Sequence, residues 1–234
     1  MYTRIQQVIR MYLADVGDLA RRLDNLSSLS DNLSRMAASI YKKMSLQETL
    51  WVFSPSESTA NEHWPIGMVA AEAFRDETPF TLKNVITRYS EPQGIRSNRL
   101  VNAYEEILFM VRDLREYYFD KDSIRVQNVY EGNEWLDRDT GRSSYHDHNV
   151  KRYNPKGKDP GNVWLNEIRT ESSNETVDRV EPLSREEAIL RCIRAGSQEE
   201  ERVTVIGFDE EIKRLIQQEN RVPTICSYSN YLEV

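Results

Sequence analysis

The densest group of side chains able to bind or react lies between residues 138 and 158. This stretch holds six basic and two acidic residues, a local charge of +4 in a chain whose net charge is −7. Tyr145 and Tyr153 lie among these charges. Basic side chains interleaved with aromatic rings are typical of contact with a nucleic-acid backbone, although a solvated loop has the same composition. Because the whole chain is acidic, any nucleic-acid contact must come from such a local patch.

Lys156 and Lys158 are the strongest candidates within this stretch. They stand beside Gly157 and Gly161, where the lack of side chains lets the backbone approach a phosphate. Arg96 and Arg99, in a second polar segment, are the next candidates. For each of these cations a solvated surface charge is the equally weighted alternative.

Other kinds of chemistry find less support in the sequence. His146-Asp147-His148 lacks the third and fourth ligands of a usual metal site, so no metal is predicted. A hydrolase needs an activated nucleophile, and no GxSxG sequence is present. Cys192 lies on the apolar face of a predicted helix, which indicates packing and not reactivity.

The composition sets the class of protein. With 234 residues and 39% apolar side chains, the chain is long enough for one large domain or one and a half. Two cysteines do not make a disulfide framework, which favours a reducing, cytoplasmic setting. There is no apolar run of roughly 20 residues, so no membrane association is predicted.

Hydrophobic periodicity predicts alternating helices and strands. Residues 3–44 have apolar positions at helical spacing and are expected to form a helical N-terminal segment, with a second helix starting at Ser30 or Asp31 after a Ser-rich break. Residues 45–234 are expected to form the main domain, with a polar, basic loop region at about 120–180. Strands are predicted at 50–53 and 81–90 and a helix at 65–75, whereas 101–111 fits either type.

The C-terminal part has the clearest pattern. Ser184 and Glu187 form a capping box for a helix over 184–195. A buried strand at 203–208, a helix at 209–218 and a final strand follow. A strand, helix and strand at this spacing make a βαβ unit and therefore a parallel sheet.

The segment 153–164, and above all GKDPGNVW, resembles a stretch of the β-arranged DNA amino-methyltransferases, the N4-cytosine and N6-adenine enzymes. TLWVFSPSE is similar to the family's strand after its catalytic region, and EPLSREEAILRCIRAGS to the helix before its cofactor motif. The resemblance implies an α/β, Rossmann-like sheet, mostly parallel, with helices on both faces. It also implies S-adenosylmethionine as cofactor and double-stranded DNA as partner, with the target base flipped out of the duplex.

The resemblance assigns site residues as well. DNA contacts are expected at Lys156, Lys158, Asn162 and Trp164, with Arg96 and Arg99 in support; Trp164 has a buried core role as its alternative. Cofactor contacts are expected at Ser197, Gly207 and Phe208.

Two motifs of the family are missing. The catalytic Asp/Asn/Ser-Pro-Pro-Tyr/Phe tetrapeptide is absent, and its nearest counterpart is Ser54-Pro55-Ser56-Glu57. The chain is therefore expected to start just downstream of this motif and to be incomplete at the catalytic end, so no catalytic residue is predicted. Acidic residues follow Phe208 where the family has a glycine-rich turn, and Cys226 stands where an acid usually binds the ribose.

Three hypotheses follow. The first is a DNA-binding methyltransferase-like protein of a restriction-modification type, inactive alone (a pseudoenzyme), which works with DNA or with an intact methylase. The second is one subunit of a split, active methyltransferase whose partner chain supplies the catalytic motif. The third is a protein-interaction module without a nucleic-acid role.

Overall fold

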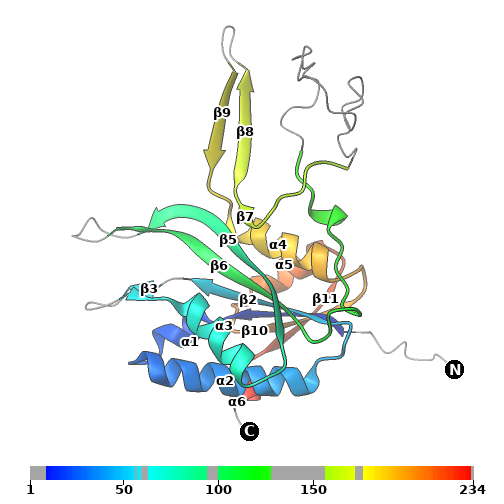
Figure 1. Ribbon diagram of the computed structural model, residues 1–234. Helices are drawn as coiled ribbons and strands as arrows, with labels where there is room; N and C mark the ends of the chain where they lie inside the picture. Colours follow the sequence, from blue (N-terminus) through cyan, green and yellow to red (C-terminus); the bar gives the residue numbers. More distant parts are fainter. Residues whose placement is uncertain are drawn as a thin grey trace, which may run out of the picture.

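A seven-stranded sheet forms the centre of the computed structural model, which describes residues 9–55, 57–58, 63–93, 100–127, 156–171 and 176–232. The strand order is β11-β10-β1-β2-β6-β5-β7 (Figure 1). The strands span Ile9–Asp15 (β1), Thr49–Pro55 (β2), Thr81–Gln93 (β5), Asn102–Val111 (β6), Val163–Trp164 (β7), Arg202–Ile206 (β10) and Val222–Cys226 (β11).

The sheet is parallel on one side and mixed on the other. β11, β10, β1 and β2 run parallel, whereas β6 is antiparallel to both β2 and β5. The predicted βαβ unit at the C-terminus is confirmed, because β10 and β11 pair in parallel around α5 (Ile212–Gln218). The ambiguous segment 101–111 is a strand. The mostly parallel α/β fold predicted from the sequence is therefore confirmed.

Helices cover both faces of the sheet (Figure 1). On one face lie α1 (Gly17–Arg21), α2 (Leu26–Lys43), α3 (Ile66–Asp76) and α6 (Ser229–Leu232). On the other face lie α4 (Arg185–Gly196) and α5. Each face has its own hydrophobic core: Leu33, Val52 and Phe74 belong to the first, and Trp51, Phe109 and Cys192 to the second. Cys192 is fully buried, which confirms its predicted packing role.

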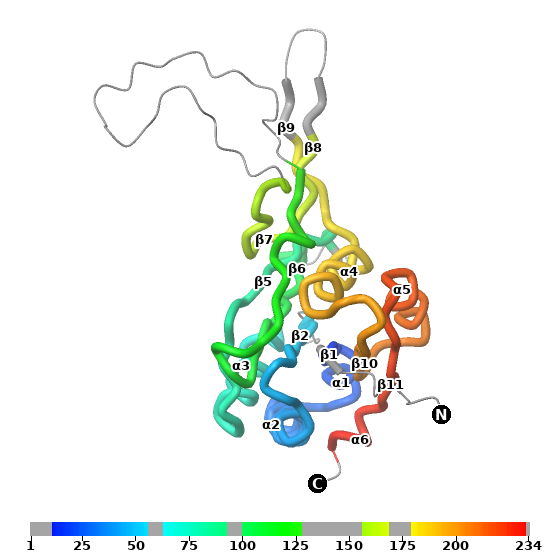
Figure 2. The backbone as a smooth tube through the Cα atoms, turned by 90° about the vertical axis from the view of Figure 1, so that its right-hand side faces the viewer, coloured from blue at the N-terminus to red at the C-terminus, as the bar shows by residue number. Residues whose placement is uncertain are grey.

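Two small strand pairs and one 3-10 turn complete the described part of the fold. β3 (Glu57–Ser58) and β4 (His63–Trp64) form a small ladder, and η1 (Asp122–Ile124) is a single 3-10 turn. β8 (Asn166–Glu171) and β9 (Thr176–Glu181) pair as an antiparallel hairpin that projects away from the sheet, as both views show (Figures 1 and 2).

The prediction of a wholly helical segment over 3–44 is wrong for its first part. Residues 9–15 form β1, which lies between β10 and β2 in the middle of the same sheet as the later strands. Helices cover both of its faces, so Met11 to Ala14 are all buried and show no alternation. The second helix is confirmed but starts earlier: Asn25 caps α2 by accepting a hydrogen bond from the Ser28 N–H at 2.8 Å.

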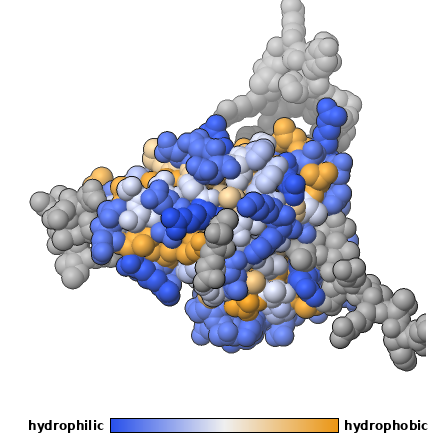
Figure 3. All heavy atoms as spheres, turned by 90° about the horizontal axis from the view of Figure 1, so that it is seen from below, coloured by the Kyte–Doolittle hydropathy of each residue, from blue (hydrophilic) through white to orange (hydrophobic). Residues whose placement is uncertain are grey.

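β11 is the edge strand, and its outer side is poorly suited to further pairing. The Val222 N–H donates inward to the Glu201 carbonyl at 2.9 Å, so the next position, Pro223, faces outward and has no N–H to offer. No helix in the described ranges is long and apolar enough to cross a membrane. Seen from the side of α2, the surface is mainly hydrophilic with small, separate hydrophobic groups (Figure 3).

Candidate functional site

The carboxyl ends of the parallel strands meet at one edge of the sheet, the usual ligand edge of open α/β folds. In register, Asp15 of β1 lies beside Phe53 of β2, and Ile206 of β10 lies beside Cys226 of β11. The chain leaves β1 through Asp15-Val16-Gly17-Asp18, and it leaves β10 through Gly207 and Phe208. This carboxyl edge is the candidate functional site.

An ion network occupies the centre of this edge. The Arg185 guanidinium, at the start of α4, contacts Asp15 Oδ2 at 2.8 Å and Glu105 Oε1 at 2.9 Å. Glu105 also pairs with Arg88 through its other oxygen at 2.9 Å. The Asp15 and Glu105 side chains are only 7% and 2% exposed, so nearly all of this carboxylate charge is buried and paired.

Two aromatic rings enclose Arg185. Its guanidinium carbon lies 5.6 Å from the centroids of both Phe53 and Phe208, and the two rings meet edge to face. Burial alone would lower the pKa of Arg185, but the neighbouring Glu105 and Asp15 carboxylates outweigh it and hold the pKa above its usual value. Arg185 therefore stays charged at any pH at which the protein is folded.

The turn after β10 is covered by Tyr228. Its hydroxyl donates to the Asp15 carbonyl oxygen across Gly207. Gly207 has a φ of +78°, and a Cβ there would lie 2.2 Å from the Tyr228 hydroxyl and 2.5 Å from the Asp15 carbonyl. Burial raises the pKa of Tyr228, with Asp15 adding to the effect, so the phenol keeps its proton. The glycine thus makes room for Tyr228 and Asp15, which fill the space above it.

A depression of about 390 Å³ lies beside Tyr228, at the ends of β10 and β11. Its lining includes Asp18, Arg22, Phe208 and Cys226. Cys226 ends β11 as predicted, and Tyr231 donates a hydrogen bond to its sulfur at 3.9 Å. No group of three or more potential metal ligands occurs among the described residues.

Ser54 lies at the same edge but on the opposite face of the sheet. Its hydroxyl is buried and has no hydrogen-bond partner among the described residues, and its cross-strand neighbour is Glu106. Burial raises the pKa of Glu106. Pro55 ends β2, and the Ser54-Pro55-Ser56-Glu57 sequence therefore leaves a different strand from the Asp15-Val16-Gly17-Asp18 turn.

Ser197 does not lie at this edge. It caps the C-terminal end of α4, where its hydroxyl donates to the Ile193 carbonyl at 2.7 Å and its own carbonyl accepts from Arg221 at 2.8 Å. α4 starts at the carboxyl edge and ends at the amino edge, so β10, at about 3.3 Å per residue, separates Ser197 from Gly207. The structure thus brings Gly207 and Phe208, but not Ser197, to the carboxyl edge.

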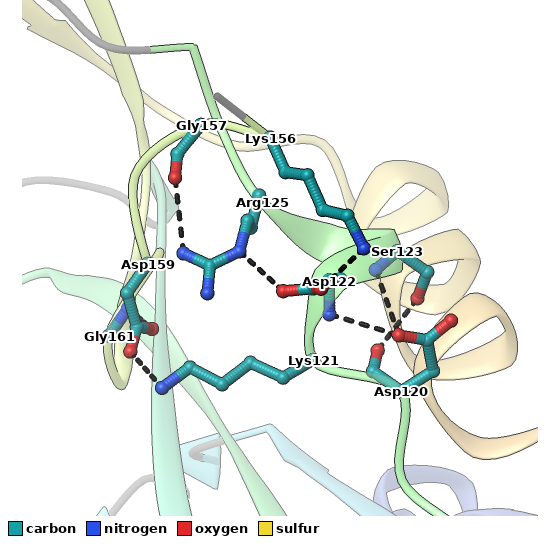
Figure 4. A network of polar contacts seen from close by, with 9 residues as sticks. All are labelled: Asp120, Lys121, Asp122, Ser123, Arg125, Lys156, Gly157, Asp159 and Gly161. Atoms are coloured by element: carbon teal, nitrogen blue, oxygen red, sulfur yellow. Dashed lines mark hydrogen bonds and ion pairs between the residues drawn. The ribbon is translucent and has the colours of Figure 1, made fainter. Parts of the chain in front are cut away.

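The two predicted lysines belong to a network of polar contacts near the base of the projecting hairpin, and Figure 4 shows the part around Lys156. Lys156 contacts Asp122 at 2.7 Å, and Asp122 also binds Arg125. Val126 and Lys158 exchange backbone hydrogen bonds of 3.0 and 2.8 Å. Lys158 contacts Glu167 at 2.7 Å. Both ammonium groups are therefore exposed and already paired with carboxylates.

Asn162 and Trp164 attach the GKDPGNVW segment to the sheet. The backbone carbonyl of Asn162 accepts a hydrogen bond from the Thr87 N–H at 2.8 Å, and its side-chain amide donates to the Val85 carbonyl at 3.2 Å. Trp164 is 1% exposed, and its indole N–H donates to the Gly161 carbonyl at 3.1 Å. The structure thus gives Trp164 the core role, the alternative to base stacking. Arg96, Arg99, the residues 138–155 and His146-Asp147-His148 lie outside the described residues.

Sequence reasoning missed Asp15, Arg185 and Tyr228 as site residues. Asp15 ends a strand whose spacing resembled a helix. Arg185 lay inside the recognised capping box of α4, but its contacts with Asp15 and Glu105 join residues 170 and 80 positions apart. Asp15 could have been placed at the carboxyl edge of the sheet if residues 9–15 had been predicted as a strand.

A doubly covered, mostly parallel sheet with an antiparallel strand between β2 and β5 defines a methyltransferase-type α/β protein. The DNA methylase family profile for N6 and N4 methyltransferases matches residues 18–204, and the chain belongs to this family. No curated protein matches the sequence.

Solved structures agree on the fold. PvuII DNA methyltransferase, cytosine-N4-specific, superposes with a TM-score of 0.62 at 11% identity, over 97% of this chain and 80% of that one. A presumed DNA modification methylase from Thermus thermophilus gives a TM-score of 0.54 at 14% identity, over 94% and 81%. Its complex with S-adenosyl-L-methionine gives 0.52 at 14% identity, over 94% and 80%.

The family's cofactor is S-adenosylmethionine, and the carboxyl edge of this chain is a poor fit for it. Tyr228 fills the space beside the Gly207 Cα, and Gly207 also lines the depression of about 390 Å³. Cys226 is a thiol at the strand end where the resemblance implies a ribose-binding acid. In the family order the catalytic tetrapeptide follows the strand before TLWVFSPSE, which is β1. Asp15-Val16-Gly17-Asp18 occupies that turn and has neither proline nor the aromatic ring.

Proposed function

We propose that this protein is a DNA-binding member of the DNA methylase family that does not transfer methyl groups by itself. The observation that carries this proposal is the contact of Tyr228 with the Asp15 carbonyl across Gly207. This contact fills the space beside the Gly207 Cα, although Gly207 also lines the neighbouring depression of about 390 Å³. The substituted turn at Asp15-Val16-Gly17-Asp18 supports the same conclusion for the catalytic step.

The ion network adds a second argument. A catalytic carboxylate or amide must be free to bind the exocyclic amine of the target base. Here the Asp15 carboxylate has both oxygens occupied, one by the Gly17 N–H at 2.9 Å and the other by Arg185 at 2.8 Å. A base amine would have to displace one of these partners from a side chain that is only 7% exposed.

DNA binding is proposed through the basic stretch 138–158 and through Arg96 and Arg99. Lys156 and Lys158 are 64% and 48% exposed, and their carboxylate partners compete with a phosphate in a screened setting. A phosphate is therefore able to replace Asp122 or Glu167 as partner at small cost. Asn162 acts indirectly in this proposal, because its contacts hold the segment on β5.

Three measurements on the purified chain test the proposal. Calorimetry with S-adenosylmethionine is expected to show no binding, and methyl transfer to duplex DNA is expected to be undetectable. Fluorescence anisotropy with labelled duplex DNA is expected to show binding that weakens as salt rises, since phosphate contacts release counterions. Methyl transfer by the chain alone overturns the first part, and absence of DNA binding at low salt overturns the second.

A matched pair of variants locates the DNA contact. Lys156→Ala with Lys158→Ala is expected to weaken DNA binding and to flatten its salt dependence by about one to two phosphate contacts. Lys213→Ala is the control, because Lys213 is also an exposed lysine paired with an acid, Glu210, but lies on α5. Equal loss of binding in both variants contradicts the assignment to the stretch 138–158.

A further inference from the structure

A second cavity, of about 260 Å³, lies away from the carboxyl edge at the base of the β8–β9 hairpin. Its walls come from the GKDPGNVW segment, the start of β8 and the middle of α4. Half of the lining residues are apolar, and Arg191 supplies a charged group from α4 beside Lys158 and Glu167. This volume is below the roughly 300–1,000 Å³ of sites for drug-sized ligands, so it suits a single ring system and not a whole cofactor.

Arg191 is the informative residue of this cavity. Its side chain is 8% exposed, and its guanidinium carbon lies 5.7 Å from the Trp164 ring. Within the described part of the chain its one hydrogen bond runs from Nε to Glu187 at 3.3 Å. A guanidinium carries five N–H donors in a planar fork, so most of the Arg191 donors are available to a group inside the cavity.

The charges around the cavity favour a neutral ligand. Glu187 compensates Arg191, and Glu167 compensates Lys158 at 2.7 Å. The formal charges of these four groups sum to zero, so the cavity lining as a whole does not favour an anionic ligand. The site therefore combines apolar walls with a planar donor fork, which fits a neutral, planar group carrying two adjacent acceptors.

The geometry points to a nucleobase site: we propose that this cavity binds a single unstacked base through Arg191, with guanine preferred. Guanine presents N7 and O6 side by side, and arginine binds this pair in bidentate fashion. Adenine presents a donor beside N7 and pairs poorly with a guanidinium. This inference deepens the proposed DNA binding, because it names a part of DNA that the chain would read outside the carboxyl edge.

Free nucleosides test the site without depending on duplex binding. The indole N–H of Trp164, which donates to the Gly161 carbonyl, is the reporter in two-dimensional NMR, assigned by Trp164→Phe among the four tryptophans. Titration with 2′-deoxyguanosine is expected to shift this resonance. 7-Deaza-2′-deoxyguanosine has the same shape but lacks N7, and it is expected to bind about tenfold more weakly, as for the loss of one good bidentate pair.

Variants assign the contact to Arg191. Arg191→Met keeps the aliphatic length and is expected to abolish the shift. Arg194→Met is the control on the same helix, because Arg194 does not line the cavity; it pairs with Glu219 at 2.7 Å and, more distantly, with Glu187 at 3.5 Å. If Arg191→Met fails to fold, comparing the binding of the two nucleosides to the unaltered protein still tests whether the cavity recognises guanine N7.

Several results overturn the inference. No shift with deoxyguanosine, equal binding of the deaza analogue, or a stronger response to inorganic phosphate or acetate each contradicts a guanine site. If the chain does not bind duplex DNA but deoxyguanosine still shifts the Trp164 indole resonance, the guanine site is supported and only the proposed DNA binding is refuted. The two proposals are therefore distinguishable.

Discussion

Replacement of Arg185 by leucine is the sharpest test of how the carboxyl edge is stabilised. Arg185 is shared by Asp15 and Glu105, but the two acids do not depend on it equally. Glu105 keeps Arg88 at 2.9 Å when Arg185 is removed. Among the described residues, Asp15 then keeps the N–H of Gly17 alone as a side-chain partner. The damage is therefore expected to fall on Asp15.

The size of the effect follows from burial. Removing one partner of a buried ion pair costs about 3–5 kcal/mol, because the other charge is left unpaired. Arg185 is 35% exposed, so water reaches the network and the lower end, about 3 kcal/mol, is expected. For a chain of this size each kcal/mol corresponds to a fall in Tm of about 2–4 °C, hence about 6–12 °C for Arg185→Leu.

Urea unfolding followed by circular dichroism measures this loss, and a double variant assigns it. Asp15→Asn in the Arg185→Leu background removes the unpaired charge and is expected to restore at least half of the lost stability. Glu105→Gln in that background is expected to restore none, because it removes the partner of Arg88.

A loss below about 1 kcal/mol, or a double variant no more stable than Arg185→Leu, refutes the reasoning.

Three further predictions concern other parts of the fold. Asn25→Ala removes the cap of α2 and should cost about 1 kcal/mol in urea unfolding, whereas Asn25→Ser should be nearly neutral. Gly207→Ala should lower Tm because its φ is +78° and its Cβ would meet the Asp15 carbonyl; an unchanged Tm argues against this turn geometry. Asp122 has its pKa lowered to about 2, mainly by the hydrogen bond from Lys156. The stabilising effect of the ionised Asp122 carboxylate is complete above its unfolded pKa of about 3.9 and disappears as pH falls toward 2. An NMR titration of the Asp122 carboxyl should therefore give a midpoint near 2, and Lys156→Ala should raise that midpoint.

The fold was largely predictable because most elements carry a local signal. Ser184 and Glu187 mark the start of α4, and the apolar run 203–208 marks β10. The prediction for residues 9–15 failed because a strand that is buried on both faces does not alternate apolar and polar side chains. Ile9, Tyr12 and Leu13 then fall at the three- and four-residue spacings of a helix, and periodicity alone does not separate the two.

The candidate site was less predictable because its contacts are long-range. Nothing in the sequence near Lys156 indicates its partner Asp122, which lies 34 positions away. The same holds for Trp164, whose burial depends on its placement beside β5 and α4. Residue types indicate which chemistry a segment is able to perform, but neighbours from other elements decide which groups are already paired.

The pairing of charges at the carboxyl edge offers a physical reason why such a scaffold persists without the family's motifs. Catalytic sites keep polar groups unpaired for their substrates, and this costs stability. At this edge the two buried carboxylates are neutralised by Arg88 and Arg185, and Tyr228 is hydrogen-bonded over Gly207. Each of these contacts stabilises the fold and opposes ligand entry. If the chain binds DNA without transferring a methyl group, as we propose, it benefits from every one of these contacts. We therefore expect that restoring the tetrapeptide at Asp15-Val16-Gly17-Asp18 destabilises this protein without making it a methyltransferase.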